Sequence, residues 1–308
     1  MKIVFLDAYS IGNADDSALM VLGEYIRYEH TTPEDVLSRC EGADVLITNK
    51  VKLMQSELKY LPSLKLICIA ATGMNNVDLK TAAEKGITVK NVADYSTDSV
   101  AEQTFAMALG LIHHTRYYDQ YVKTGAYSNS GLFTHHGRPF FELKGKKWGI
   151  IGMGHIGQRV AEIATAFGAH IAYYSTSGKN LEAGFPCLSL NDLMEQCDII
   201  SIHAPLNEQT QYLLDYEKLR LMKPTAYLIN VGRGGIVNET DLVEALREEH
   251  LAGAALDVYE QEPAPLNNPL LSSDIQEKLL LSPHIAWASA EARQRLVDTM
   301  VQHIKNHF

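Results

Sequence analysis

Cysteine, basic charge and long apolar runs are all scarce in this chain, and each shortage excludes a class of protein. The four cysteines are scattered, without a CxxC pair or metal-ligand spacing, which predicts reduced thiols in a cytoplasmic protein and no metal site. Lys and Arg number 27 against 37 Asp and Glu, so the net charge of −10 favours neither nucleic acid nor an anionic membrane as partner. No apolar run is long enough to span a bilayer, and the apolar opening is too short for a signal peptide.

Length and patterning together indicate a two-domain α/β protein. A chain of 308 residues exceeds the usual size of one domain, and 46% hydrophobic residues can fill a complete core. Short apolar runs alternate with helix-like stretches, which predicts parallel, doubly wound sheets that bind ligands at the carboxyl ends of their strands. The expected strands cover residues 3–6, 45–48, 66–70, 88–91, 148–151, 170–175, 198–204, 226–231, 252–258 and 279–282.

The glycine-rich stretch at residues 152–157 is the strongest single motif. It follows an apolar strand and precedes an amphipathic helix and a second strand, which is the context of a dinucleotide-binding turn. Gly152 would make the turn, Gly154 would let the backbone approach a pyrophosphate, and Gly157 would let the helix pack closely on the strand. The free N–H groups of the helix start, including those of His155 and Ile156, would then point at the phosphates.

Two long helical segments suggest how the domains are connected. Residues 96–118 predict a buried helix that crosses between domains, and residues 119–147 read as a connection or a subunit-contact arm. The histidine pairs at 113–114 and 135–136 are interpreted as ordinary polar residues. Residues 289–307 predict a closing helix that follows the last strand and returns to the first domain, which would make that domain discontinuous.

A second candidate binding turn follows the strand at residues 66–70. The stretch from Ala70 to Asp78 is rich in small residues, and its backbone N–H groups could hold a carboxylate. The alternative is an ordinary strand-to-helix turn in which Asn76 or Asp78 caps the next helix. The local pattern leaves these two interpretations open.

Three polar residues stand just after expected strands or in the loops beyond them. Arg233, Glu262 and His284 are a guanidinium, a carboxylate and an imidazole, a set that suits reduction of a 2-keto acid. Arg233 can hold carboxylate and ketone oxygens and polarise the carbonyl, and His284 can supply the proton as a hydride arrives on the carbon. Glu262 would orient the imidazole and favour its protonated form. Taken singly, each residue is better explained without a catalytic role: Arg233 by a surface ion pair, Glu262 by a solvated loop and His284 by a satisfied core position.

Taken together, the motifs resemble the D-isomer-specific 2-hydroxyacid dehydrogenases over nearly the whole chain. The resemblance implies a Rossmann-type dinucleotide-binding domain at residues 99–286, inserted into a flavodoxin-like substrate domain formed by residues 1–98 and 287–308. It also implies a homodimer, a small 2-keto or 2-hydroxy acid substrate, and NAD(H) or NADP(H) as cofactor. The stretches that carry the resemblance are ATG-MNNVD, GMGHIG, NVGRGGIVNE, LDVYEQEP and SPHIAW.

The resemblance also assigns roles residue by residue. It implies that Arg233 is the substrate arginine, Glu262 the carboxylate partner and His284 the acid/base. Asp257 resembles the residue that contacts the nicotinamide carboxamide. Thr72 and Gly73, in the motif ATG, match the carboxylate-binding turn of the family. Asp257 lies in the motif LDVYEQEP, and Trp287 lies in SPHIAW.

Within the family, the motifs look most like those of glycerate dehydrogenases, which are hydroxypyruvate/glyoxylate reductases. Phosphoglycerate dehydrogenases usually carry a long C-terminal domain, whereas this chain stops at Phe308, and formate dehydrogenases have glutamine where Glu262 stands. A D-lactate-type enzyme and a dinucleotide-regulated, corepressor-like binding protein are the alternatives. Trp287 either shapes the substrate pocket or simply packs between domains.

One position departs from the common NAD-binding pattern. An acidic residue normally ends the second strand and accepts hydrogen bonds from the ribose hydroxyls. Here Ser175 and Thr176 occupy that position, and Lys179 follows closely. Without a carboxylate to repel a 2′-phosphate, the sequence predicts that NADP is tolerated alongside NAD.

Overall fold

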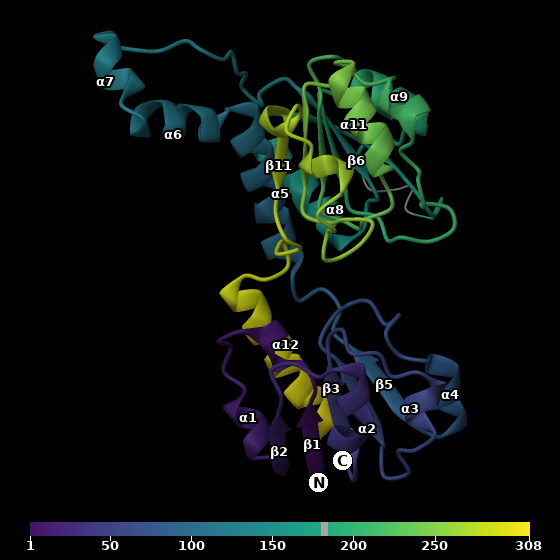
Figure 1. The fold of residues 1–308 in the computed structure, drawn as a ribbon. Coiled ribbons are helices and arrows are strands. Elements are labelled where there is room, and N and C mark those ends of the chain that lie inside the picture. The colour runs from purple at the N-terminus through teal and green to yellow at the C-terminus, as the bar shows by residue number, and fades with distance from the viewer. Residues whose placement is uncertain (180–183) are drawn as a thin grey trace. The chain divides into compact units, whose positions relative to one another are not determined.

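The chain folds into two compact units. The computed structural model describes residues 1–179 and 184–308. Unit 1 comprises Met1–Ser96 and Ala288–Phe308, and unit 2 comprises Thr97–Trp287 (Figure 1). Within the described residues, no helix has both the length and the apolar character needed to cross a membrane.

Unit 1 contains a parallel sheet of five strands in the order β2-β1-β3-β4-β5. Four of these strands lie where the sequence predicts them, but β2 is missing from the prediction. Its first and last residues, Glu24 and Arg27, are charged, and none of its four residues is buried, because β2 is an edge strand that pairs on one side with β1. The strands are β1 (Lys2–Phe5), β2 (Glu24–Arg27), β3 (Val45–Thr48), β4 (Leu66–Ile69) and β5 (Thr88–Asn91).

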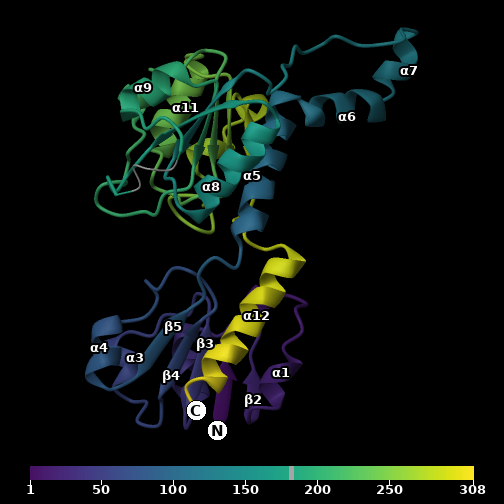
Figure 2. The same ribbon diagram turned by 180° about the vertical axis from the view of Figure 1, so that it is seen from behind.

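Helices cover the sheet of unit 1, as a doubly wound fold requires. Val4, Leu46 and Ile67 pack in one cluster with side chains of α2, α3 and α4. The closing helix α12 packs against β4 and η1, and the Ser289 hydroxyl caps its first turn (Figure 2). The helices are η1 (Ala8–Ile11), α1 (Ser17–Met20), η2 (Pro33–Asp35), α2 (Val36–Cys40), α3 (Gln55–Leu58), α4 (Leu79–Glu84) and α12 (Ala290–Lys305).

Unit 2 contains a second parallel sheet of six strands in the order β11-β10-β9-β8-β6-β7. Outside β7, Cys187 forms one further parallel bridge to Tyr173, at the place of an additional edge strand. Because β6 lies between β7 and β8, the chain reverses its direction of winding there. The strands are β6 (Lys147–Ile151), β7 (His170–Tyr174), β8 (Ile199–Ile202), β9 (Tyr227–Asn230), β10 (Gly253–Leu256) and β11 (Leu279–Leu281).

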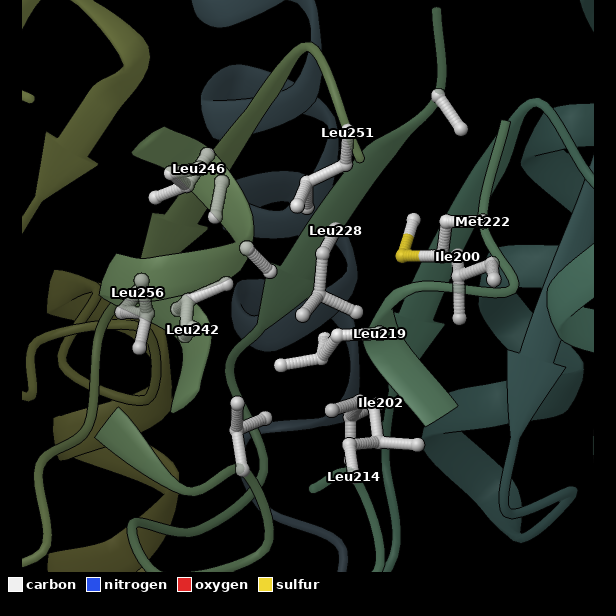
Figure 3. Packing of buried hydrophobic residues seen from close by; sticks show 14 of the residues in the cluster. Ile200, Ile202, Leu214, Leu219, Met222, Leu228, Leu242, Leu246, Leu251 and Leu256 are labelled. Atoms are coloured by element: carbon white, nitrogen blue, oxygen red, sulfur yellow. The ribbon is translucent and has the colours of Figure 1, made fainter. Parts of the chain in front are cut away.

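Apolar side chains fill both faces of the unit 2 sheet. On one face, Leu228 and Ile202 pack with Leu219 and Leu242 from the covering helices (Figure 3). On the other face, Trp148 packs with side chains of α5 and α8. Burial on both faces explains why these strands read as nearly continuous apolar runs. The helices are α5 (Thr97–Ile112), α6 (Thr115–Lys123), α7 (Ala126–Ser130), α8 (His155–Ala166), α9 (Leu190–Gln196), α10 (Tyr216–Leu219), α11 (Glu239–Arg247), η3 (Pro269–Leu271) and η4 (Gln276–Lys278).

The long helix predicted for residues 96–118 is divided in the structure. Helix α5 packs within unit 2 against α8 and strands β9 to β11, and it ends at Ile112. His114 then takes a left-handed conformation (φ 51°), so α6 starts in a new direction. A continuous helix would have required an ordinary helical φ at this residue. Helices α6 and α7 project from the rest of unit 2 (Figures 1 and 2).

Candidate active site

Each glycine of the 152–157 turn meets a different steric demand. Gly152 directly follows β6 and has a φ of 94°, and an added Cβ would lie 2.9 Å from the Ala204 nitrogen after β8. An added Cβ on Gly157 would overlap the carbonyl oxygen of Gly152, so α8 packs closely on the turn. Gly154 precedes α8, and the space that a Cβ would occupy there is open. The turn therefore leaves room at the start of α8, where the N–H groups of His155 and Ile156 begin the helix.

A hydrogen-bonded chain beside this turn was not foreseen from the sequence. Trp148 Nε1 donates to Ser201 Oγ (2.9 Å), and Ser201 Oγ lies 3.0 Å from His203 Nε2. The hydroxyl proton is then directed at Nε2, so we assign the imidazole proton to Nδ1. Burial lowers the pKa of His203 to about 3, which keeps the ring neutral. Nδ1 is shielded from solvent and has no hydrogen-bond partner among the described residues.

The sequence signal for His203 was the alternation within strand β8. Ser201 and His203 are polar residues two positions apart in an otherwise apolar run, so they share one face of the strand. That face carries Trp148 on the neighbouring strand β6. An unpartnered N–H at the carboxyl end of β8, next to the Gly152 turn, indicates a place for a ligand with hydrogen-bond acceptors.

The end of β7 carries small polar residues in place of a carboxylate. Ser175 and Thr176 are partly buried, and Lys179 is exposed. The Gly178 N–H donates to the Ser175 carbonyl at 3.4 Å, so the chain turns back directly after the strand. No acidic side chain occurs from residue 175 to 179.

The three candidate catalytic residues follow three neighbouring strands. Arg233 follows β9, Glu262 follows β10 and His284 follows β11, and these strands are adjacent in the sheet. His284 Nδ1 lies 2.7 Å from Glu262 Oε2, with about a quarter and a third of the two side chains exposed. Arg233 is exposed, and its Nη1 donates to the Gly232 carbonyl at 2.7 Å. The structure thus brings the carboxylate and the imidazole into contact, with Nε2 of the ring available for a second bond.

Asp257 fixes the loop that carries His284. The residue is fully buried, and its carboxylate accepts hydrogen bonds from the Ser282 hydroxyl and from the N–H groups of Ile285 (2.9 Å) and Ala286 (2.8 Å). The His284 N–H donates to the Asp257 carbonyl at 2.7 Å, and His284 has a φ of 55°. The carboxylate expected near the nicotinamide therefore already holds three donors, and its contact with a cofactor stays a prediction.

The turn after β4 in unit 1 contains Thr72 and Gly73. The Thr72 hydroxyl donates to the Val92 carbonyl (3.1 Å), so the side chain pins the turn to the strand β5 exit. The carboxylate of Asp78 accepts from the Thr81 N–H (3.0 Å) and caps α4, as the structural alternative predicted. The cap formed by Asp78 does not involve the backbone N–H groups of Thr72 and Gly73. Binding of a substrate carboxylate by these two residues stays a prediction.

The glycine turn lies within a segment that matches a known domain. The family description "D-isomer specific 2-hydroxyacid dehydrogenase, NAD binding domain" matches residues 105–286, which is more than half of the chain. The chain belongs to this family. It is therefore a D-2-hydroxyacid dehydrogenase, an oxidoreductase that acts on CH–OH donors and uses a nicotinamide dinucleotide.

Curated relatives and a solved structure show the same relationship over the full chain. The dehydrogenase is 37% identical to the hydroxypyruvate reductase of Blautia hydrogenotrophica, over 99% of this chain and 96% of that protein. It is 36% identical to the glycerate dehydrogenase of Methylorubrum extorquens, over 99% and 95%. The NADPH-dependent glyoxylate/hydroxypyruvate reductase of Sinorhizobium meliloti, solved with NADP and malonate, superposes with a TM-score of 0.80, at 28% identity over 99% and 92%.

The residues of this D-2-hydroxyacid dehydrogenase fit a dinucleotide at the glycine turn. Open space above Gly154, the start of α8 and the unpartnered Nδ1 of His203 all lie around the point where the winding of the sheet reverses. Among the described residues, no group of three His, Cys, Asp or Glu side chains is placed to hold a metal ion.

Proposed function

We propose that this dehydrogenase reduces hydroxypyruvate or glyoxylate to D-glycerate or glycolate. The observation that carries the proposal is the 2.7 Å contact between Glu262 and His284 beyond β10 and β11, beside the Arg233 segment that follows β9. An imidazole oriented by a carboxylate is suited to deliver a proton to a developing alkoxide. The curated relatives support a 2-hydroxy acid substrate of small size, since they include hydroxypyruvate, glycerate and glyoxylate enzymes.

In the proposed reaction, Arg233, His284 and Glu262 have different roles. Arg233 pairs with the carboxylate and ketone oxygens and draws electron density from the carbonyl carbon. A reduced nicotinamide, when bound, supplies the hydride to that carbon. His284 Nε2 donates its proton to the ketone oxygen, so that a C=O bond becomes CH–OH with one hydride and one proton added. Glu262 stabilises the imidazolium before the transfer and holds the ring in place afterwards.

We assign the dinucleotide to unit 2 and a share of substrate binding to unit 1. In unit 2, Gly152, Gly154, Gly157 and the start of α8 form the pyrophosphate turn, and the Asp257 region lies on the nicotinamide side. In unit 1, the N–H groups at Thr72 and Gly73 are proposed to bind the substrate carboxylate. The exposed apolar side chains of the α6–α7 segment support a homodimer.

The decisive test is turnover followed by the absorbance of NADH and NADPH. We expect activity with hydroxypyruvate and glyoxylate, and less with pyruvate and phosphohydroxypyruvate. His284→Ala should lower kcat by about 100-fold or more, because a general acid contributes that much. Dinucleotide affinity should persist in this variant. Unchanged turnover in His284→Ala would remove the acid/base assignment.

Cofactor choice is tested at the end of β7. Ser175→Asp places a carboxylate where the 2′-phosphate of NADPH would lie, so kcat/KM with NADPH should fall much more than kcat/KM with NADH. Ser177→Asp, two residues farther along the exposed turn, is a comparison for general charge effects. Equal losses with both cofactors in Ser175→Asp would mean that the ribose lies elsewhere.

A further inference from the structure

The loop that carries Glu262 abuts the segment that carries Arg233. Strand β9 leads through Gly232, Arg233 and Gly234 to α11, and strand β10 leads to Tyr259 and the Glu262 loop. An added Cβ on Gly234 would overlap the carbonyl oxygen of Tyr259. The two segments are therefore in close backbone contact at Gly234 and Tyr259.

One buried carboxylate joins these two segments. Glu239 is the first residue of α11 and is only 5% exposed. Its Oε1 accepts a hydrogen bond from the Glu260 N–H (2.7 Å), and its Oε2 accepts one from Asn268 Nδ2 (2.7 Å). We propose that Glu239 is a positioning residue, which holds both ends of the 260–268 loop and thereby sets the Glu262 carboxylate against His284.

The two hydrogen-bond partners of Glu239 are themselves held by further hydrogen bonds. Its own N–H donates to Glu260 Oε1 at 2.9 Å, so the two glutamates exchange backbone-to-carboxylate bonds. The Tyr212 hydroxyl donates to the other oxygen of Glu260 at 3.3 Å. The amide of Asn268 is itself fixed, because its Oδ1 accepts from the Leu270 N–H at 2.9 Å. The far end of the loop is therefore anchored to η3 as well as to α11.

The Glu239 carboxylate is buried, which costs free energy. Burial raises the pKa of Glu239, and the hydrogen bonds from Glu260 and Asn268 offset only part of that effect. Desolvation of the carboxylate is compensated in part by its two donors. An apolar residue could not bind two donors eight positions apart in sequence, and it would leave both of them without this acceptor. Holding the loop ends is the task that only an acceptor with two oxygens performs here.

The contact between Glu262 and His284 depends on the position of the loop that Glu239 holds. Glu262 Oε1 accepts from the Tyr259 N–H (3.2 Å) within the same turn, so the carboxylate moves with its loop. Its other oxygen lies 2.7 Å from His284 Nδ1, and a shift of about 1 Å would break that hydrogen bond. Misplacement of this size in a catalytic group can cost about 100-fold in rate. Glu239 therefore acts on the reaction through Glu262, without touching substrate.

The test rests on the proposed function and uses the pH–rate profile of keto acid reduction. In Glu239→Gln, the amide keeps one acceptor but turns an NH₂ group toward either Glu260 or Asn268, which frees one end of the loop. Because a displaced Glu262 no longer favours the imidazolium, the alkaline limb of the profile should move to lower pH, and kcat should fall about 10- to 100-fold. Dinucleotide affinity should not change. Glu244→Gln, on the exposed face of the same helix, should leave the profile as it is.

Further variants separate positioning from folding. Asn268→Ser removes the amide donor that binds Glu239 at the other end of the loop, and it should move the alkaline limb of the pH–rate profile in the same direction. This variant tests the positioning role if Glu239→Gln does not fold. Glu262→Gln should shift the limb by itself, and adding Glu239→Gln to it should cause no additional shift. A Glu239→Gln enzyme with lower thermal stability but an unmoved limb, or an additive shift in the double variant, would overturn the proposal. Absence of turnover in the wild-type enzyme would instead refute the proposed function.

Discussion

His203 is a neutral histidine directly after strand β8. His203 accepts from Ser201, which in turn accepts from Trp148, so two side chains hold the imidazole in one tautomer. A buried N–H without a partner normally costs about 1 to 3 kcal/mol. Its presence at the carboxyl end of β8 is accounted for if a bound ligand supplies the missing acceptor.

The same histidine should make the enzyme sensitive to acid. In the unfolded chain the pKa of a histidine is about 6.5, whereas burial lowers the pKa of His203 to about 3. Below about pH 6.5 the unfolded state binds a proton that the folded state does not, so stability is lost toward pH 3, by at most about 1.4 kcal/mol per pH unit. His203→Gln should flatten this slope in urea unfolding measured from pH 7.5 to 4.5. His170→Gln, at an exposed position, should not, and an equal slope in His203→Gln and wild type would contradict the assignment.

The sequence predicted where the candidate catalytic residues stand but not how they are held. Arg233 and His284 follow apolar runs that could be recognised as strands, and parallel strands end at one edge of a sheet. The support of His284 by Asp257, and of the Glu262 loop by Glu239, depends on contacts between segments more than 20 residues apart. Such contacts follow from tertiary packing, which local patterns do not record.

Among the secondary-structure elements, the buried strands were predicted correctly and a partly exposed edge strand was not. Strands β3 and β9 are buried on both faces and lie where the apolar runs predicted. Strand β2 was missed because an edge strand needs few apolar residues. The helix over residues 96–118 was predicted as one because the apolar pattern does not reveal the left-handed conformation that His114 takes at the break. The closing helix α12 lies within residues 289–307, where the sequence predicted it, and the Ser289 side chain caps its start.

The contact between α8 and the glycine turn gives a prediction about an element. A Cβ on Gly157 would overlap backbone, so Gly157→Ala must push α8 away from the Gly152 turn. We expect a loss of about 1 to 3 kcal/mol in the free energy of unfolding, and weaker NADH binding. In Gly154→Ala the Cβ enters open space, so stability should be nearly unchanged while NADH binding weakens. Urea unfolding and fluorescence titration measure both, and wild-type behaviour of Gly157→Ala would show that the packing is not tight.

At the scale of the molecule, the two units share a sheet order but use it differently. In each unit the first strand lies between the second and third, and doubly wound sheets bind ligands at the carboxyl ends of the first and third strands in this order. In unit 1 the Asp7 carboxylate occupies that position and accepts from the N–H groups of Asn49 (2.8 Å), Lys50 (2.6 Å) and Val51 (3.1 Å). In unit 2 the corresponding turn begins at Gly152. We therefore expect a ligand in unit 2 to bind at the place that an internal carboxylate fills in unit 1.

At the same scale, we predict that two copies of the chain associate. Helices α6 and α7 contain no buried residue, and the segment that follows them exposes Leu132 (64%) and Phe133 (95%). Apolar side chains gathered on a projecting segment mark a protein interface. We expect a dimer in sedimentation experiments at micromolar concentration, and the double change Leu132→Ser with Phe133→Ser should shift it toward monomer. Leu266→Ser, an exposed leucine outside this segment, should leave the dimer intact. A monomeric wild type, or a double variant that stays dimeric, would show that copies do not associate through this segment.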